Sequence, residues 1–183
     1  MEKSSGGSLD ALLTTRLHLI PLDLTDLQVL LSHPARISAA PELSLSSKLV
    51  TSQIELAIEA KIIKIQSAGP ALYLWYTYWL IAISEEGIGA GMVGFKGKPD
   101  AEGAVEFGYG MDERYQNRGF MTEAVQAMIR WAFSHPLCRR ISAQTLRTNL
   151  PSQRVLIKSG FKIYKETHAA FDWKLDRPAQ PTS

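Results

Sequence analysis

The sequence predicts one mixed α/β domain, in which a mixed but mostly antiparallel sheet carries helices on both faces. Short apolar or alternating segments, which are typical of strands, occur in groups along the chain. Longer segments with apolar residues at a spacing near 3.6 interrupt these groups, and this order favours a sheet covered by helices. The length of 183 residues suits one domain with a sizeable core, and neither a repeat nor a linker divides it.

The first half of the chain begins with a segment, TRLHLIPL, whose alternation of polar and apolar residues predicts a strand. A capping box formed by Ser52 and Glu55 introduces a later helix, which Gly69 and Pro70 should end. In chain order we expect a strand over 15–22, a helix from 23 or 25 to about 32, a loop over 35–47, a helix over 52–67, and strands over 78–84 and 88–95.

A cluster of aromatic residues precedes the second predicted strand: Tyr73, Trp75, Tyr76, Tyr78 and Trp79. Such side chains most often fill the core and its rim, because each buries a large apolar area. They could also line a substrate pocket or pack against a partner, and the sequence leaves these alternatives open.

The run Gly89–Gly94 is a literal G-x-G-x-x-G, with Asp112 about twenty residues further on, as a dinucleotide-binding fingerprint requires. In that fingerprint a helix must begin at the third glycine. Here a turn-like segment, FKGKPD, follows instead. We therefore interpret the glycines as strand positions and predict that the chain does not bind NAD.

The segment 105–133 is the centre of the predicted fold, because it reads as strand, short loop and long helix. Gly119 stands where the loop enters the helix and would let the backbone approach a ligand closely. The first N–H groups of a helix lack intrahelical partners and lie at the positive end of its dipole, so they bind phosphate well. Arg114 and Arg118 are expected to add full positive charge beside them.

The second half of the chain continues with strands and a short helix after this central helix, which His135 and Pro136 should end. We expect the central helix to reach about 134, followed by a strand over 140–147, a helix over 149–159, and strands over 161–167 and 170–175.

Composition excludes several classes of protein. The net charge of +2 does not suggest a nucleic-acid-binding protein, which usually has a clustered basic face, and no metal site is expected. Cys138 is the single cysteine, so an internal disulfide is impossible and a reducing, cytoplasmic location is expected. The apolar run 71–83 is too short to span a bilayer, so no membrane segment is predicted. We expect tails over 1–14 and 178–183 around a domain over 15–177.

Several motifs resemble one family. Gln116-x-x-Gly119, between a strand and a long helix, is similar to the pyrophosphate loop of the GNAT N-acetyltransferases, although Met121 replaces the last glycine or alanine of that pattern. The segment 149–161, NLPSQRVLIKSGF, resembles the corresponding segment of the RimJ/RimL-like ribosomal-protein alanine N-acetyltransferase branch. The motifs EFGY at 106–109 and TRL…PL at 15–22 resemble that branch as well.

The resemblance implies a GNAT-like fold and an acetyl-CoA-dependent N-acetyltransferase. It implies that the coenzyme pyrophosphate binds N–H groups of 118–122, that Met111 donates a backbone N–H to the thioester oxygen, and that Asn149 and Arg154 contact pantetheine and phosphate. The implied coenzyme-binding residues are Met111, Gln116, Asn117, Arg118, Gly119, Phe120, Met121, Thr122, Asn149 and Arg154.

Two catalytic residues are candidates. Many relatives place a tyrosine acid where this chain has Leu156, so the hydroxyl of Ser152 is the alternative group near the coenzyme sulfur, or else it caps the helix after Asn149. Glu106 is the best candidate for a base that removes the amine proton through water, or else it is a solvent-facing strand residue.

The acceptor is expected to be a primary amine, either a protein N-terminal α-amine or a small molecule. An α-amine with a pKa of about 7.7–8.0 requires little help from a base, whereas a lysine amine near 10.4 requires about 4.6 kcal/mol for deprotonation at pH 7. The sequence does not name the amine and leaves the oligomeric state open, including a homodimer. A non-catalytic module that senses acyl-CoA or scaffolds a partner is the alternative function.

Overall fold

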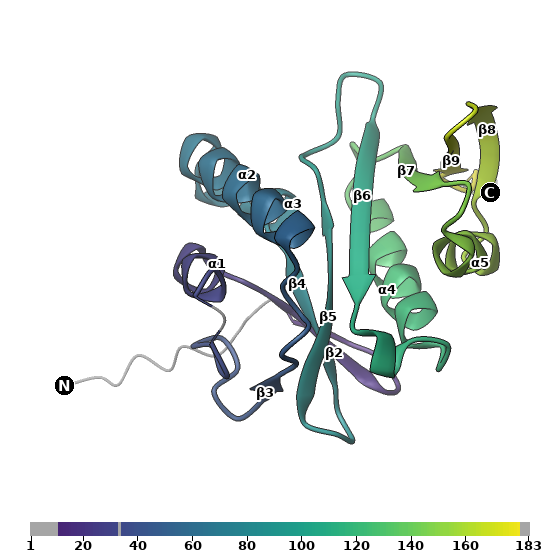
Figure 1. The fold of residues 1–183 in the computed structure, drawn as a ribbon. Helices are drawn as coiled ribbons and strands as arrows, with labels where there is room; N and C mark the ends of the chain where they lie inside the picture. Colours follow the sequence, from purple (N-terminus) through teal and green to yellow (C-terminus); the bar gives the residue numbers. More distant parts are fainter. Residues whose placement is uncertain (1–10, 33, 180–183) are drawn as a thin grey trace.

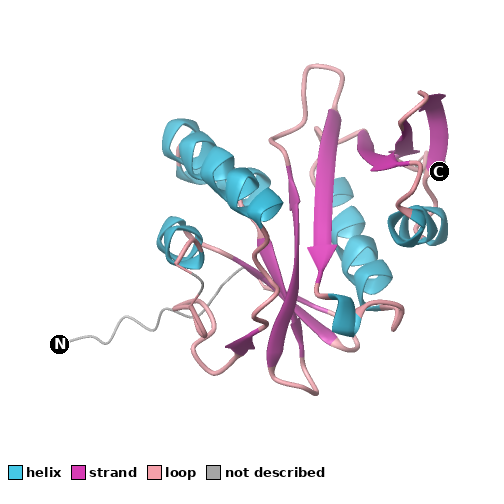
Figure 2. Ribbon diagram, in the orientation of Figure 1, coloured by secondary structure: helices cyan, strands magenta, loops and turns pink. Residues whose placement is uncertain are grey.

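The sheet of this protein is open and carries helices on both faces, as the computed structural model shows for residues 11–32 and 34–179 (Figures 1 and 2). Its strands, in chain order, are β1 (Leu12–Leu13), β2 (Leu17–Pro21), β3 (Ser44–Leu45), β4 (Trp79–Ile83), β5 (Ile88–Phe95), β6 (Ala104–Met111), β7 (Arg140–Leu146), β8 (Lys162–Glu166) and β9 (Ala170–Asp176). Its helices are α1 (Leu24–Leu30), α2 (Ser52–Ala68), α3 (Tyr73–Tyr76), α4 (Phe120–Ser134) and α5 (Leu150–Lys158), with the 3-10 turns η1 (Pro70–Leu72) and η2 (Glu113–Tyr115).

The strand order in the described residues is β1-β2-β4-β5-β6-β7-β9-β8, with β3 beside β5. The pairs β3–β5 and β6–β7 are parallel, and the other neighbours are antiparallel. The expected mixed, mostly antiparallel sheet is therefore confirmed.

Two hydrophobic cores lie on opposite faces of the sheet. Apolar residues of α1 and α2, such as Leu27 and Ile58, pack with Leu80 and Met92 on one face. On the other face, apolar residues of α4 and α5 pack with a second set of strand residues. Along the strands, this set alternates with the residues of the first core. The alternation along β5 and β6 thus assigns each side chain to one helical layer.

The parallel pairing of β6 with β7 is short, and this decides where a ligand can enter. The paired residues run from Ala104 opposite Arg140 to Glu106 opposite Ser142, and the pairing ends there. Beyond Glu106 the two strands diverge, and α5 follows β7 on the far side of the opening (Figure 1).

The aromatic cluster before β4 belongs mainly to the core. Trp75 and Trp79 are buried, and the Trp75 ring lies 5.0 Å from that of Phe95 and 4.6 Å from that of Trp131. The short helix α3, which we did not predict, carries Trp75 and places its ring in this contact.

Three local expectations need correction. The predicted loop over 35–47 contains β3, which lies parallel to β5. The capping residue of α2 is Thr51, whose Oγ1 accepts the N–H of Ile54, rather than Ser52. The sheet begins at Leu12, inside the predicted tail, because β1 pairs with β2; residues 1–10 and 180–183 of the predicted tails lie outside the described residues.

The interpretation of Gly89–Gly94 as strand residues is confirmed, because the whole run lies in β5. A Cβ on Gly94 would stand 2.6 Å from the carbonyl oxygen of Thr77, and one on Gly91 would stand 2.7 Å from that of Gly110. These glycines therefore allow close approach of neighbouring backbone, which is a packing role and not a phosphate-binding one.

We expect Gly94→Ala to lower the free energy of unfolding by about 1–3 kcal/mol, because the added methyl group overlaps the Thr77 carbonyl. Urea denaturation of the variant and of wild type measures the difference. Gly108→Ala is the matched control, since it lies opposite Gly94 on β6 and its Cβ would meet nothing within 4 Å. Equal losses in the two variants would contradict the packing role.

Candidate coenzyme site

A cavity of about 320 Å³ lies at the end of β6, between the loop that leads into α4 and the first turns of α5. Its lining is polar at the loop and partly apolar along the strand. The lining residues are Tyr109, Gly110, Met111, Tyr115, Gln116, Asn117, Gly119, Phe120, Met121, Thr122, Asn149, Pro151, Ser152, Arg154, Val155 and Lys158. The structure thus gathers most of the residues that we assigned to the coenzyme around one cavity.

The backbone of β6 offers hydrogen-bonding groups to this cavity. In an antiparallel pair only alternate residues exchange hydrogen bonds with the partner strand. The N–H of Asp112 donates to Ala90 and the N–H of Lys96 donates to Glu106, so the even-numbered residues of β6 are the ones that pair with β5. The N–H groups of Tyr109 and Met111 therefore point away from β5, into the opening where β7 has diverged.

The first turn of α4 presents free N–H groups to the same cavity. Gly119 is the N-cap residue with φ +84°, and Asn117 has φ +60°, so the loop turns sharply before the helix. No side chain among the described residues caps the helix. Glu123 of the first turn is turned away, because its carboxylate accepts hydrogen bonds from Thr14 and Arg16.

The positive charge on the cavity comes from α5. Arg154 and Lys158 line it, whereas the side chains of Arg114 and Arg118 do not. Our expectation for those two loop arginines is wrong for their side chains, because each has a carboxylate partner elsewhere. Arg118 pairs with Glu86 (2.6 Å), and Arg114 pairs with Asp112 (2.8 Å).

Arg16, at the entry to β2, supports the loop from outside. Its Nη1 donates to the carbonyl of Arg118 (3.0 Å), its Nη2 pairs with Glu123 (2.7 Å), and its guanidinium lies 4.6 Å from the Phe120 ring centre. Sequence reasoning missed this role, because the two segments are about one hundred residues apart and Arg16 resembles any solvated strand residue.

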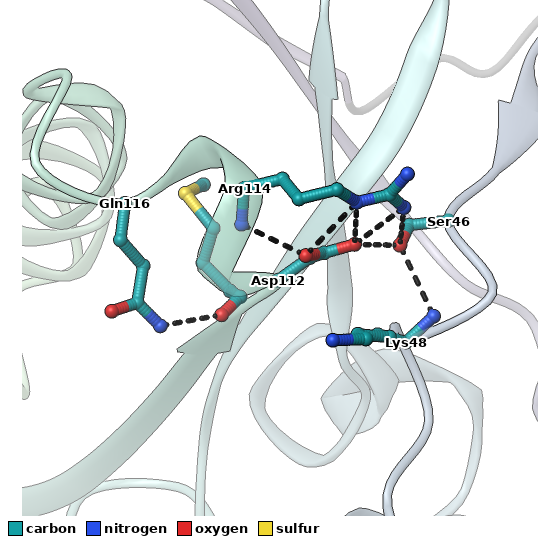
Figure 3. A network of polar contacts seen from close by, with 6 residues as sticks. Ser46, Lys48, Asp112, Arg114 and Gln116 are labelled. Atoms are coloured by element: carbon teal, nitrogen blue, oxygen red, sulfur yellow. Dashed lines mark hydrogen bonds and ion pairs between the residues drawn. The ribbon is translucent and has the colours of Figure 1, made fainter.

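A buried carboxylate holds the turn between β6 and the loop (Figure 3). The Asp112 side chain is fully buried, and its two oxygens accept hydrogen bonds from the Arg114 backbone N–H (3.0 Å), the Arg114 guanidinium (2.8 Å) and the Ser46 hydroxyl. Gln116 reaches back from the loop and donates to the carbonyl of Met111 (2.9 Å). The end of β6 and the loop are therefore fixed relative to each other.

Ser46 reaches this network because β3 and the residue after it lie along the same edge of β5 as β6, starting where β6 ends. The N–H of Ser46 donates to Gly89, and the N–H of Asp112 donates to the next residue, Ala90. Ser46 is buried, and its hydroxyl also accepts the N–H of Lys48 (3.2 Å). The segment predicted only as a loop is thus hydrogen-bonded to the turn that follows β6.

The start of α5 contributes Asn149 and Ser152. The side chain of Asn149 caps the helix by accepting the N–H of Ser152 (3.2 Å), so the capping role considered for Ser152 belongs to Asn149. The carbonyl of Ser152 accepts the phenol of Tyr109 (3.1 Å), and burial raises the pKa of that phenol. Leu156 is fully buried in the core, which explains an apolar residue there.

Glu106 lies outside the cavity. Its carboxylate pairs with Lys96 (2.5 Å) and is about one-third exposed, at 37%. Because side chains alternate along a strand, Glu106 shares the α2-facing side of β6 with Gly108 and Gly110, whereas Tyr109 and Met111 face α4.

Three other features of the described residues bear on function. These residues contain no group of three or more His, Cys, Asp or Glu side chains arranged to hold a metal ion. Within the same residues, every helix is too short or too polar to cross a membrane. Cys138 is buried, and burial raises the pKa of its thiol to about 11, so it is not an activated nucleophile.

Comparison with known proteins gives one family. The family model described as "Acetyltransferase (GNAT) domain" matches residues 16–162. The uncharacterized N-acetyltransferase YjdG of Bacillus subtilis (strain 168) is 36% identical over 96 residues, which are 52% of this chain and 55% of YjdG. The uncharacterized N-acetyltransferase YnaD of the same strain is 36% identical over 61 residues, 33% of this chain and 36% of YnaD. The chain thus spans about half or less of the length of these curated relatives.

Solved structures share the fold over nearly the whole chain. The ribosomal-protein-S5-alanine acetyltransferase from Vibrio fischeri has a TM-score of 0.65 at 17% identity, over 91% of this chain and 96% of its own. The ribosomal L7/L12 α-N-protein acetyltransferase RimL, solved in complex with coenzyme A, has a TM-score of 0.65 at 19% identity, over 91% and 98%.

The Asp112 network predicts a pH-dependent contribution to stability. The hydrogen bonds from Arg114, together with that from Ser46, hold the pKa of Asp112 well below its usual range, although burial opposes them. A carboxylate whose pKa is lower in the folded state stabilises the fold above its unfolded pKa of about 3.9, and this contribution is lost as the pH falls further. Asp112→Asn should therefore lower the free energy of unfolding by about 1–3 kcal/mol at pH 7, and by progressively less below pH 4.

Urea titrations between pH 3 and pH 7 measure this difference. Asp176→Asn is the control, because Asp176 pairs with Arg140 at the exposed surface and should contribute less than about 1 kcal/mol. A loss for Asp112→Asn that stays constant across this range would show that the carboxylate charge is not involved.

Proposed function

The chain belongs to the acetyltransferase (GNAT) domain family, and from this premise we propose that it transfers the acetyl group of acetyl-CoA to a primary amine. The acceptor class that we propose is a protein N-terminal α-amine, with small-molecule amines as the broader group. Transfer takes place by direct attack while both substrates are bound.

The observation that carries this proposal is the chemistry of the cavity at the end of β6. Free N–H groups of α4 at residues 120–122 lie at the positive end of the helix dipole, and Arg154 and Lys158 face them from α5. No Asp or Glu is among the described residues that line this cavity. Such a site suits the pyrophosphate of a coenzyme, with Gln116, Asn117 and the backbone of Arg118 shaping the loop around it.

The divergence of β6 from β7 suits the pantetheine arm. From the loop, the cavity follows β6 to Tyr109 and Ser152, so the thioester lies at that end. The inward-facing N–H groups of Tyr109 and Met111 can pair with pantetheine amides or with the oxyanion that develops on the thioester carbonyl. Asn149 and Arg154 line the opposite side, where the arm and the phosphates pass.

The reaction requires no metal ion. The neutral amine attacks the thioester carbon, the C–S bond breaks, and coenzyme A leaves as a thiolate that accepts a proton. Ser152 lines the cavity, and Asn149, not Ser152, caps α5, so the Ser152 hydroxyl is our candidate donor to the sulfur. Glu106 is our candidate base because it is a carboxylate on β6; it lies about 10 Å along the strand from Tyr109, so a chain of waters would carry the proton to it.

We favour an N-terminal α-amine as the acceptor. The carboxylate of the candidate base is remote from the thioester, and an α-amine requires little help from a base. About a tenth of such amines are neutral at pH 7, whereas a lysine amine is almost entirely protonated. Two of the neighbouring folds are named as acetyltransferases of ribosomal proteins, which agrees with this class. A cytoplasmic location follows as part of the proposal, because acetyl-CoA and unmodified N-termini occur there, and the catalytic domain would span residues 15–177.

The central test measures acetyl-CoA binding by calorimetry and thiol release with peptide N-termini, polyamines, amino acids and aminoglycosides as acceptors. Wild type should bind acetyl-CoA and release thiol with at least one amine. Gly119→Val should weaken binding at least tenfold, about 1.4 kcal/mol, because φ +84° disfavours a β-branched residue and its side chain would meet Arg16.

The results separate the proposal from its alternatives. Binding without thiol release from any acceptor would indicate a sensor or scaffold that uses the same loop. Unchanged affinity in a folded Gly119→Val variant would contradict the assignment of the loop. NAD should not raise the melting temperature, whereas acetyl-CoA should, since stabilisation follows ligand concentration over Kd.

Glu106→Gln tests the base. The variant keeps the size of the side chain but cannot accept a proton, and loss of a general base lowers rates by about 10²–10⁴. The loss in kcat/KM should be largest at low pH, where nearly all acceptor amine is protonated, and should shrink toward the pKa of the amine. Acetyl-CoA affinity should change little, because Glu106 does not line the coenzyme cavity.

A pH–rate profile of both proteins decides the role of Glu106. A reduction that is equal at every pH would instead assign Glu106 to positioning, through its ion pair with Lys96. An unchanged profile would make it a bystander on the strand.

A further inference from the structure

A second hollow, of about 550 Å³, opens at the other end of β6 from the coenzyme loop. The last turn of α2, the end of α3 and the hairpin between β5 and β6 form its walls, and this hairpin is the long turn at the top of Figure 1. Its lining residues are Lys64, Ser67, Ala68, Tyr76, Lys96, Gly97, Lys98, Pro99 and Asp100. Nothing in the proposed coenzyme chemistry uses this hollow.

The lining has a net positive charge, because it contains three lysines and one aspartate. Lys96 pairs with Glu106, but Lys64 and Lys98 have no ion-pair partner among the described residues. Asp100, the one carboxylate of the lining, is engaged by the turn, because its Oδ1 accepts the N–H groups of Glu102 and Ala104. The Lys98 ammonium therefore remains available to an anion. The Lys64 ammonium donates one hydrogen bond to the carbonyl of Lys96 (2.9 Å), but it keeps its charge and two further N–H donors.

A buried lysine, Lys61, lies close enough to two lysines of the lining for their charges to act on it. Lys61 donates to the carbonyl oxygens of Tyr76, Thr77 and Phe95, at 3.1, 3.1 and 2.6 Å. Burial lowers its pKa to about 7, and the charges of Lys64 and Lys96 act in the same direction. Cations that repel one another in this way would be stabilised by a bound negative group.

A strip of bare backbone connects the hollow with the proposed reaction centre. Glu106, Gly108 and Gly110 occupy the α2-facing side of β6, and a Cβ on Gly108 would meet nothing within 4 Å. A Cβ on Gly110 would lie 3.6 Å from the side chain of Ile54 on α2. An extended chain could therefore lie along β6 between the two ends.

We propose that the lysine-lined hollow binds an acidic group of the acceptor, so that the acceptor is an N-terminal peptide with a carboxylate or phosphate near its start. This inference rests on the proposed function and adds the class of substrate. Lys64 and Lys98 determine this specificity, and they do not take part in the transfer itself.

The geometry of the strand gives the position of the acidic residue. The thioester end of the coenzyme cavity lies beside Tyr109, and the Lys96–Glu106 pair is three residues away along β6, about 10 Å. An extended peptide advances about 3.4 Å per residue, so the acidic group belongs at about the third or fourth position, counting the acetylated residue as the first. Acidic residues further along should have little effect.

The test compares hexapeptides that begin with alanine and carry one glutamate, in turn at the second to the sixth position, with the matching glutamine peptides. We expect kcat/KM to be about tenfold higher for glutamate at the third or fourth position, mainly through a lower KM. Phosphoserine peptides at the same positions distinguish a preference for phosphate from one for carboxylate.

Two lysine variants connect the preference with the hollow. Lys64→Ala/Lys98→Ala should lose the advantage of the acidic peptides and leave kcat/KM for glutamine peptides unchanged. Lys98→Glu should reverse the preference toward a peptide with lysine at the same position, a gain that simple damage to the fold would not produce. Lys162→Ala, which removes an exposed lysine on β8, is the matched control and should retain the preference.

The outcomes separate this inference from the proposed function. Equal kcat/KM for glutamate and glutamine peptides, with thiol released from both, would overturn the acidic site and leave the transferase. Transfer to small amines but to no peptide would also overturn it. Binding of acetyl-CoA without transfer to any acceptor would overturn the proposed function and this inference together.

Discussion

The divergence of β6 from β7 after Glu106 is the constraint on which the site depends. A parallel pair that continued would have used the outward N–H groups of Tyr109 and Met111 in the sheet and would have closed the cavity. Because the pairing stops, these groups face an opening whose other wall is α5. Backbone polar groups in such a place require partners, and a ligand rich in amide and carbonyl groups can supply them.

The divergence would be of little use if the loop beyond β6 were free to move. Asp112 prevents this by joining three segments: the turn η2, the end of β6 and, through Ser46, the segment that includes β3 (Figure 3). The same carboxylate withdraws Arg114 from the cavity. In the proposed coenzyme cavity the backbone N–H groups are therefore fixed in place, and among the described residues the cationic side chains that line it, Arg154 and Lys158, come from α5.

β6 also organises the acceptor side. Its two faces differ, because odd-numbered residues carry aromatic and apolar side chains into the α4 core, whereas Gly108 and Gly110 leave the α2 face nearly bare. One strand thus presents N–H groups to the coenzyme opening along its edge, bare backbone on one face, and a lysine-lined hollow at its start. The reaction proposed here uses these features together: the donor enters at one end and the acceptor extends toward the other.

Local sequence determined most of the elements and the loop, because apolar periodicity, Gly119 and the cap at Asp23 act over a few residues. It did not predict β3 or α3, and it left the cap of α5 to Ser152 instead of Asn149. The rejection of a dinucleotide site at Gly89–Gly94 was equally local. Only the tertiary structure decided the destinations of long charged side chains: Arg114 and Arg118 leave the cavity for Asp112 and Glu86, and Arg16 and Lys158 come to it from distant segments. Arg16 does not line the cavity but contacts the loop from outside, whereas Lys158 lines it. Such choices depend on which partner lies within reach after folding, and sequence spacing does not contain that distance.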